Sequence, residues 1–430
     1  MTRQPPISST SGISLSRRQV SLSALSLLLG ASVLPKQVWA APSETVGQQA
    51  EWGQTYDAAA SMKIQRSQSP ILSPATFAAT EAAIEQMRNV VAQGGWPDMP
   101  KASLKLGMRD KNVIALRRRL IASGDLDAGL GNSNIFDSYV EAGLRKFQGR
   151  HGLSTSGEFG AQSVIAMNIP ADVRLRQLEI NLVRLRSYAS TPGYRFVVAN
   201  IPAAIVETVE NGQVVTRHAA GVGKIDRQSP VMTTRATDIN FNPFWTVPAS
   251  IIRKDLIPKM QADAKYLTDN HIRVYDRSGQ EVEPGRINWR SDEATRYVFR
   301  QDTGGEFNSL GFVRINIANP YGVYMHDTPA KGIFGDDFRF VSSGCMRLQN
   351  VRDYVTWLLK DTPGWTREKI DEVIASGQRV DARLSQTVPV YWIYITAWAT
   401  PEGTMEFRDD IYNKDGLGAV PVAAAISDQD

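Results

Sequence analysis

The run Tyr324-Met325-His326-Asp327-Thr328-Pro329 is followed, sixteen residues after its histidine, by Ser342-Ser343-Gly344-Cys345-Met346-Arg347. Cys345 is the only cysteine among 430 residues, so it forms no disulfide within the chain. A lone cysteine is usually a small buried hydrophobic residue. Two serines and a glycine before the sulfur instead favour an exposed turn, whose backbone N–H groups are free to face a substrate oxyanion. The run therefore predicts a reactive thiol.

A reactive thiol needs a base or a cation nearby, and His326 is the best candidate. It ends an alternating run, Gly322 to His326, which is typical of a strand that delivers a side chain to its end. A histidine in such a place is more often a hydrogen-bonded structural residue. Its pairing with the Ser-Gly-Cys turn favours the functional interpretation.

Together these two runs resemble the signature of the L,D-transpeptidases, the YkuD-type cysteine enzymes that crosslink peptidoglycan. Four further runs resemble the large multidomain branch of that family in Gram-negative bacteria. These runs are Gly223–Pro230, Asn242–Pro248, Arg300-Gln301 and Asn308–Gly311. The resemblance covers roughly residues 195 to 415.

The resemblance implies an acyl transfer in which Cys345 is the nucleophile and His326 is the general base and proton donor. Backbone N–H groups of Ser343, Gly344 and Cys345 are the candidates for the oxyanion site. The implied reaction cleaves a meso-diaminopimelate to D-Ala bond in a tetrapeptide stem, releases D-Ala and passes the acyl group to an amine. A 3,3 crosslink results, and no metal or organic cofactor is required.

Three more residues are candidate substrate contacts. Arg347 either binds a substrate carboxylate or braces the loop. Tyr324 should lie beside His326 on the same strand face, because residues two apart share a face. Trp245 is either a wall of the cleft or a core residue.

The first forty residues have the pattern of a signal peptide. Arg17-Arg18 precedes an uncharged run from Val20 to Leu34, and small residues follow at Ala40-Ala41. The paired arginines suggest the twin-arginine route, which leads to the periplasm. Without residues 1–40, 44 basic residues face 44 acidic ones, so charge gives no reason to expect nucleic acid as a partner. No second stretch is apolar enough to predict a stable membrane span.

Between this segment and the catalytic run the sequence predicts helices. Residues 41–102 are interpreted as a flexible leader followed by a helical scaffold. Residues 103–170 carry three short amphipathic stripes and resemble three-helix peptidoglycan-binding modules, although a spacer without a ligand is the alternative. Residues 171–193 are predicted to be a linker helix that packs on the scaffold, with its arginines on a solvated face.

From residue 194 the hydrophobic period changes to two. Residues 204–216 predict a β-hairpin around Asn211-Gly212, and residues 388–398 predict one long strand. An insertion of about 249–296 is long for a plain connection and predicts a subdomain that caps the site. The predicted fold is therefore a multidomain α+β protein with a mostly-β catalytic domain at 194–416 and a disordered tail at 417–430.

Other functions stay open at this stage. Water as the acceptor would give an L,D-carboxypeptidase, and an envelope protein's amine would give wall anchoring. A non-catalytic wall-binding scaffold would make the helical module the working part and Cys345 incidental. The chain has no Cys-x-x-Cys, no His-Glu-x-x-His and no Ser-x-x-Lys, so a zinc site or a serine nucleophile of the penicillin-binding type is not predicted. The expected partners are peptidoglycan stem peptides and glycan.

Overall fold

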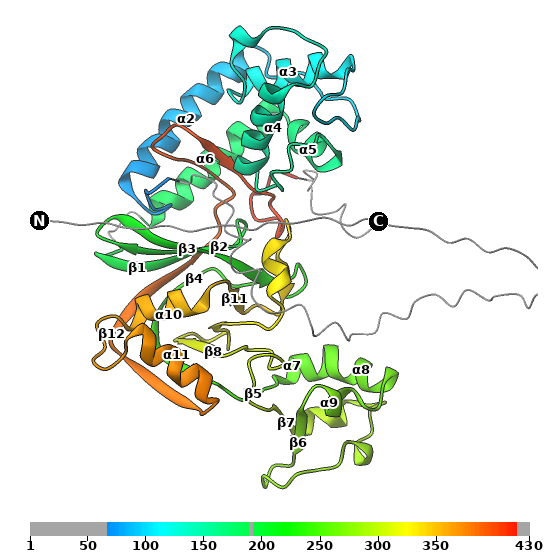
Figure 1. Cartoon of the computed structure of the whole chain (residues 1–430), viewed down its shortest axis with the longest axis vertical. Coiled ribbons are helices and arrows are strands. Elements are labelled where there is room, and N and C mark those ends of the chain that lie inside the picture. Colours follow the sequence, from blue (N-terminus) through cyan, green and yellow to red (C-terminus); the bar gives the residue numbers. More distant parts are fainter. Residues whose placement is uncertain (1–66, 189–191, 419–430) are drawn as a thin grey trace, which may run out of the picture. The chain divides into compact units, whose positions relative to one another are not determined.

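The computed structural model describes residues 67–188 and 192–418 (Figure 1). A helical region comes first along the chain and a β-rich region follows, which confirms the predicted α+β class. The signal-peptide prediction, most of the leader and most of the predicted tail lie outside the described residues. Within the described ranges, no helix is long and apolar enough to cross a membrane.

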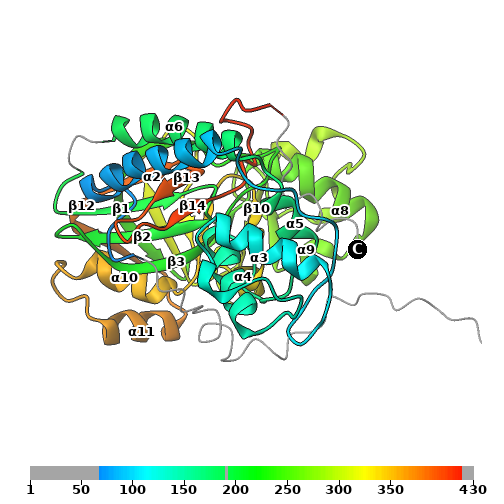
Figure 2. The same ribbon diagram turned by 90° about the horizontal axis from the view of Figure 1, so that it is seen from above.

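Two long helices form the scaffold, α2 (Pro74–Ala92) and α6 (Ala171–Ser187). Ser73 caps α2 by accepting a hydrogen bond from the Thr76 N–H at 3.1 Å, and Pro74 occupies the first turn, where its missing N–H costs nothing. The helices lie side by side against a small hairpin (Figure 2), whose strands are β13 (Ala397–Ala399) and β14 (Met405–Phe407). Their shared apolar core explains the predicted packing.

One prediction for this scaffold was wrong. Arg174 does not lie on a solvated face, because its side chain is buried with its guanidinium 4.6 Å from the Phe407 ring centroid. It also donates to Gln177 Oε1 at 2.8 Å.

The small module follows the scaffold's first helix and has its own core. Its helices are α3 (Asn112–Ala122), η1 (Ala128–Leu130), α4 (Ser138–Arg150) and α5 (Ala161–Met167). The predicted stripes form that core, with Val113, Leu116, Val140 and Phe147 fully buried. An isolated bridge between Leu104 and Phe159 closes the module at its ends.

A nine-stranded sheet forms the centre of the β-rich region, in the order β10-β3-β11-β9-β8-β4-β12-β1-β2. Because β2 also pairs with β3, eight of these strands close into a barrel. The strands are β1 (Arg195–Asn200), β2 (Ile205–Glu210), β3 (Gln213–Gly223), β4 (Met232–Phe241), β8 (Val313–Ile317), β9 (Met325–His326), β10 (Phe340–Ser342), β11 (Met346–Leu348) and β12 (Val380–Ile393). The predicted hairpin is β2–β3, and both Asn211 and Gly212 have positive φ.

Helices α10 (Val351–Leu359) and α11 (Arg367–Ser376) cover the apolar face of this sheet, and η5 (Lys331–Gly335) lies in the β9–β10 connection. The prediction of one strand over 388–398 was wrong, because β12 ends at Ile393 and β13 starts at Ala397. The Thr396 N–H donates to Asn181 Oδ1 at 2.9 Å, and Thr396 Oγ1 donates to Asp415. These bonds replace the hydrogen bonds that a continued strand would make to its neighbour, and they turn the chain toward the helical scaffold.

The predicted insertion has a core and a three-stranded sheet of its own, in the order β5-β7-β6. Its elements are β5 (Trp245–Thr246), α7 (Ala249–Ile251), η2 (Ile252–Leu256), α8 (Ile257–Ala262), α9 (Tyr266–Asp269), β6 (Ile272–Tyr275), η3 (Pro284–Arg286), η4 (Asp292–Arg296) and β7 (Val298–Gln301). The insertion is therefore a subdomain rather than a long loop.

Candidate active site

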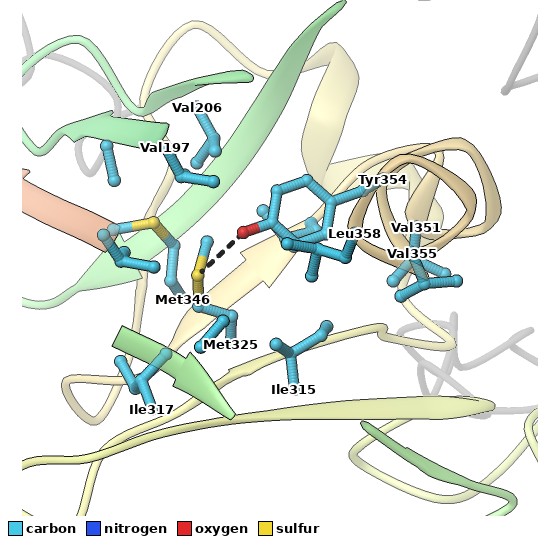
Figure 3. Packing of buried hydrophobic residues seen from close by; sticks show 14 of the residues in the cluster. Val197, Val206, Ile315, Ile317, Met325, Met346, Val351, Tyr354, Val355 and Leu358 are labelled. Carbon is cyan, nitrogen blue, oxygen red and sulfur yellow. Dashed lines mark hydrogen bonds between the residues drawn. The ribbon is translucent and has the colours of Figure 1, made fainter. Parts of the chain in front are cut away.

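Three short neighbouring strands, β8, β9 and β11, carry the residues that the sequence singled out. Met325 and Met346 pair across β9 and β11 and point into the core, where Tyr354 Oη donates to Met325 Sδ at 3.4 Å (Figure 3). Because side chains alternate along a strand, His326 and Arg347 lie on the opposite face. The core thus fixes the register that places the two residues side by side.

His326 is buried, with 5% of its surface exposed. Its Nδ1 is hydrogen-bonded to the Asp327 carbonyl oxygen. A carbonyl can only accept, so Nδ1 carries the proton and Nε2 is left as a hydrogen-bond acceptor. Burial, reinforced by the Arg347 charge, lowers the pKa of His326 to about 3. The ring is therefore neutral at pH 7 and able to take a proton.

The turn that carries Cys345 is held by hydrogen bonds among small residues. Ser342 Oγ donates to the Cys345 carbonyl at 2.6 Å and accepts from the Gly344 N–H at 3.1 Å. Gly344 has a φ of 109°, a conformation that favours glycine. The hydroxyl of the buried Ser229 donates to the Gly344 carbonyl at 2.9 Å.

These bonds correct one part of the sequence prediction. The Gly344 N–H is already bonded to Ser342, so it is not a free oxyanion donor in this structure. The contribution of Gly344 is instead the left-handed turn that presents Cys345. The exposed Ser343 accepts a hydrogen bond from Arg227 at its hydroxyl.

The Cys345 thiol is half-buried, and burial raises its pKa. Hydrogen bonds from Tyr324 and the charges of Arg314 and Arg347 oppose that rise without reversing it. Cys345 and His326 are therefore both neutral at rest, unlike a pre-formed thiolate and imidazolium. Such a thiol must pass its proton to a base as it attacks.

Tyr324 links several of the predicted residues. Its ring makes an edge contact with His326 at 5.6 Å between centroids, and the Arg314 guanidinium lies 4.3 Å from the Tyr324 centroid. Burial and the neighbouring Cys345 raise the pKa of Tyr324, and the nearby Trp245 side chain opposes that rise. Trp245 is half-buried in β5, so the insertion contributes a residue to the surroundings of Tyr324 and Cys345.

Asp327 holds the loop after the histidine. Its Oδ2 accepts from the Phe312 N–H at 3.0 Å, and Oδ1 pairs with Lys331 Nζ. The carboxylate is buried and fully engaged, so its role is structural.

Arg227 connects the cysteine turn to the insertion. Its guanidinium binds both oxygens of Asp255, at 2.6 and 2.9 Å, and the same Nη1 donates to Ser343 Oγ at 2.9 Å. Asp255 belongs to η2 of the insertion. A two-point arginine–carboxylate contact fixes orientation as well as distance. The subdomain is thereby tied to the turn that carries Cys345.

We expect Arg227→Gln and Asp255→Asn each to lower kcat/KM by about tenfold, because each removes the charge-assisted contact that orders the turn. Since both act through one contact, the double variant should be no worse than either single variant. Steady-state kinetics of the three variants measure this. Losses that multiply in the double variant would show that the two residues act independently.

Sequence reasoning missed three residues of this site: Arg314, Arg227 and Ser229. The run Gly223–Pro230 was noted for its resemblance, but nothing in it indicated that Arg227 and Ser229 reach the cysteine turn. Arg314 sits in an alternating apolar strand, where a single arginine carries no signal of its own. Within 67–188 and 192–418, no group of three or more His, Cys, Asp or Glu residues is arranged to hold a metal ion.

The β-rich region and the small helical module each resemble a known domain family. Residues 194–370 match the model described as the L,D-transpeptidase catalytic domain, YkuD. Residues 194–370 are thus similar to the L,D-transpeptidase catalytic domains. Residues 109–167 match the model "Putative peptidoglycan binding domain", which agrees with the small helical module. The predicted limits of 194–416 and 103–170 enclose the two matches and remain predictions.

The chain is also similar to individual proteins and solved structures. A Haemophilus influenzae protein named "Putative L,D-transpeptidase" is 33% identical over 241 residues, which are 56% of this chain. The chain spans about half of that relative's length, 48%. Among solved structures, an L,D-transpeptidase from Stackebrandtia nassauensis matches at 12% identity over 72% of this chain and 99% of its own, with a TM-score of 0.25. One from Mycobacterium smegmatis matches at 16% identity over 46% and 58%, with a TM-score of 0.23.

Buried neutral histidines make the fold sensitive to acid. Burial lowers the pKa of His218 to about 4 and that of His326 to about 3, and it also depresses the pKa of His151. In the unfolded chain each would titrate near pH 6.5, so below that pH the unfolded state binds more protons. The free energy of unfolding is therefore undiminished above pH 6.5 and falls as the pH drops toward 4.

We expect a loss of about 1 kcal/mol per pH unit for each of these histidines between pH 6 and pH 4.5, because the full proton difference of about 1.4 kcal/mol per unit is only approached. Urea unfolding at several pH values measures this slope. A stability that stays constant from pH 7 to pH 5 would contradict the neutral state of the buried histidines.

Proposed function

We propose that this chain is a peptidoglycan L,D-transpeptidase that forms 3,3 crosslinks. The observation that carries the proposal is the state of His326, which is neutral, protonated at Nδ1 and free at Nε2, on the strand that pairs with the one following Cys345. A neutral thiol needs such an acceptor to become a nucleophile. The family match of residues 194–370 supports the same reaction class.

The reaction proceeds in two transfers. Cys345 Sγ attacks the carbonyl carbon of the third residue of a tetrapeptide stem, meso-diaminopimelate, while its proton passes to His326 Nε2. The C–N bond to D-Ala breaks, and His326 returns the proton to the leaving amine. An acceptor amine then attacks the thioester, its proton is taken by His326, and the thiol is restored. No atom or electron from a cofactor is needed.

The residues around Cys345 have three roles in this proposal: oxyanion donors, a wall of the cleft and a carboxylate contact. The N–H groups of Ser343 and Cys345 are assigned to the developing oxyanion, since that of Gly344 is bonded to Ser342. Trp245 and Tyr324 form the wall beside the thiol. Arg347 binds a substrate carboxylate, because its Nε is buried and has no hydrogen-bond partner.

The helical module supports peptidoglycan as the partner, since it matches a peptidoglycan-binding model. We assign it to the glycan. A peptidoglycan substrate places the enzyme outside the cytoplasm, and the pattern of residues 1–40 favours the twin-arginine route to the periplasm. Neighbouring stems and an envelope protein's amine are both chemically suitable acceptors.

Mass spectrometry of disaccharide tetrapeptides incubated with the purified protein tests the proposal, with Cys345→Ala as the control. Dimers that lack one D-Ala and require Cys345 are expected. Tripeptide monomers alone would replace the proposal by an L,D-carboxypeptidase. Unchanged substrate would overturn the crosslinking activity and favour protein anchoring or a wall-binding scaffold.

A further inference from the structure

A row of three charged or titratable side chains crosses the site. Arg314 of β8 pairs with His326 of β9, and Arg347 of β11 pairs with His326 from the other side. The three side chains share the face opposite the apolar core, because Val313, Ile315, Met346 and Leu348 point into that core. The general base is therefore flanked by a guanidinium on each neighbouring strand.

Neither guanidinium has an anion. Among the residues that the structure describes, Arg314 and Arg347 make no salt bridge and no side-chain hydrogen bond, and the Nε atom of each is buried without a partner. The acidic residues nearby are already engaged, because Asp327 binds Lys331 and Phe312, and Asp255 binds Arg227.

Unpaired cations of this kind are costly. Both side chains are half-buried, so each guanidinium loses part of its hydration without gaining an ion pair, and burial lowers the pKa of Arg347. Arg314 makes one favourable contact, with the Tyr324 ring. A carboxylate placed between the two arginines would satisfy both, since guanidinium N–H groups match carboxylate geometry.

We propose that Arg314 and Arg347 form a two-arginine carboxylate site beside Cys345, and that Arg314 makes the enzyme select substrates with a carboxylate close to the bond that is cleaved. The proposal rests on the proposed function for the identity of that substrate. Two carboxylates of a tetrapeptide stem have this chemistry, the one on the leaving D-Ala and the one on the side chain of meso-diaminopimelate.

A carboxylate at this place would also assist the base. Both arginines disfavour a positive charge on His326, and the charge of Arg347 is the larger of the two effects. An anion bound between them offsets that repulsion as the imidazole takes the thiol proton. The substrate thereby supplies the negative charge that the protein lacks. With a compound that has no carboxylate, proton transfer from the thiol to His326 is less favourable.

Alkylation of the single cysteine tests the site without any substrate. Iodoacetate is negatively charged and iodoacetamide is neutral, and the two reagents are otherwise similar. The alkylation rate with iodoacetate divided by that with iodoacetamide therefore reports an anion site beside the sulfur. Relative to free cysteine, we expect this ratio to be about tenfold higher for Cys345, and Arg314→Gln to lower it about tenfold through loss of a charge-assisted contact. Arg314→Lys should fall between the two, and Arg235→Gln, an exposed arginine on β4, should leave the ratio unchanged.

Other outcomes would overturn the proposal. A wild-type ratio equal to that of free cysteine would do so without reference to any variant. A role of Arg314 confined to bracing the Tyr324 ring would slow both reagents alike, so an unchanged ratio in Arg314→Gln would also overturn it.

Substrate analogues separate the two carboxylates and separate this proposal from the proposed function. One of the two carboxylates is bound by the arginines, and its amidation should lower kcat/KM for the wild type. In Arg314→Gln, the same amidation should not lower kcat/KM any further. Amidation of the other carboxylate should affect both proteins equally. If the ratio is raised but the protein forms no crosslinks, the carboxylate site is supported and the transpeptidase proposal is refuted. If the protein forms crosslinks but the ratio equals that of free cysteine, the transpeptidase proposal is supported and the carboxylate site is refuted.

Discussion

His326→Gln should lower kcat/KM for a tetrapeptide stem by about a thousandfold, because the thiol then has no base to take its proton. Burial raises the pKa of Cys345, so little thiolate forms spontaneously to replace the missing base. The rate of iodoacetamide alkylation at pH 7 should fall as well, since it depends on the same proton transfer. Both rates are measured on the purified variant after its thermal unfolding has been compared with that of the wild type.

His271→Gln is the matched control. His271 is exposed and makes a tilted ring contact with Phe307, outside the strands that carry the site. We expect His271→Gln to keep the wild-type kcat/KM and the wild-type rate of iodoacetamide alkylation. A His326→Gln enzyme within tenfold of the wild type would show that another group accepts the proton.

Gly223→Ala should destabilise the protein by about 3 kcal/mol, because the added methyl group meets backbone rather than a movable side chain. Its Cβ would lie 2.5 Å from the Ser229 nitrogen and closer still to the Arg227 carbonyl oxygen. The Gly223 N–H also donates to Ser229 Oγ at 2.9 Å, and its carbonyl accepts from Tyr412. The loop from 224 to 230 must therefore shift.

A shift of that loop should also lower activity, because Arg227 and Ser229 both hold the cysteine turn. We expect kcat to fall at least tenfold at a temperature where the variant is still folded. Gly285→Ala is the control, since Gly285 is exposed with no atom near its added Cβ. Urea unfolding and steady-state kinetics measure both effects. A Gly223→Ala protein with wild-type stability would contradict the tight packing of the loop on β3.

The sequence singled out Cys345 and His326, the nucleophile and base of our proposal, because their local patterns are unusual. A lone cysteine after Ser-Ser-Gly and a histidine at the end of an alternating run both indicate chemistry without reference to the rest of the chain. The Asn211-Gly212 hairpin was predictable for the same reason, since its signal lies within a few residues.

Features that depend on strand register were not predictable in this way. Arg314 becomes a neighbour of His326 only because β8 pairs with β9 at that register. Thr396 leaves the strand ladder because Asn181 lies opposite it, 215 residues earlier in the chain. Arg174 is buried because Phe407 packs over it from β14. In each case the deciding partner is distant in sequence.

The protonation states also required the structure. Sequence alone indicates that a thiol and an imidazole are paired, but whether they rest as ions or as neutral groups depends on burial and nearby charge. Burial disfavours the charged form of both Cys345 and His326. The resting pair is therefore neutral.

Intact-protein mass spectrometry during a single turnover tests the central claim most directly. With a tetrapeptide stem as the donor and no acceptor, the protein should gain the mass of the donor without its D-Ala, and peptide mapping should place the adduct on Cys345. An added stem amine should then remove the adduct as crosslinked dimer. A protein that consumes the donor with no adduct on Cys345, or one that forms dimers equally well as Cys345→Ala, would contradict the account.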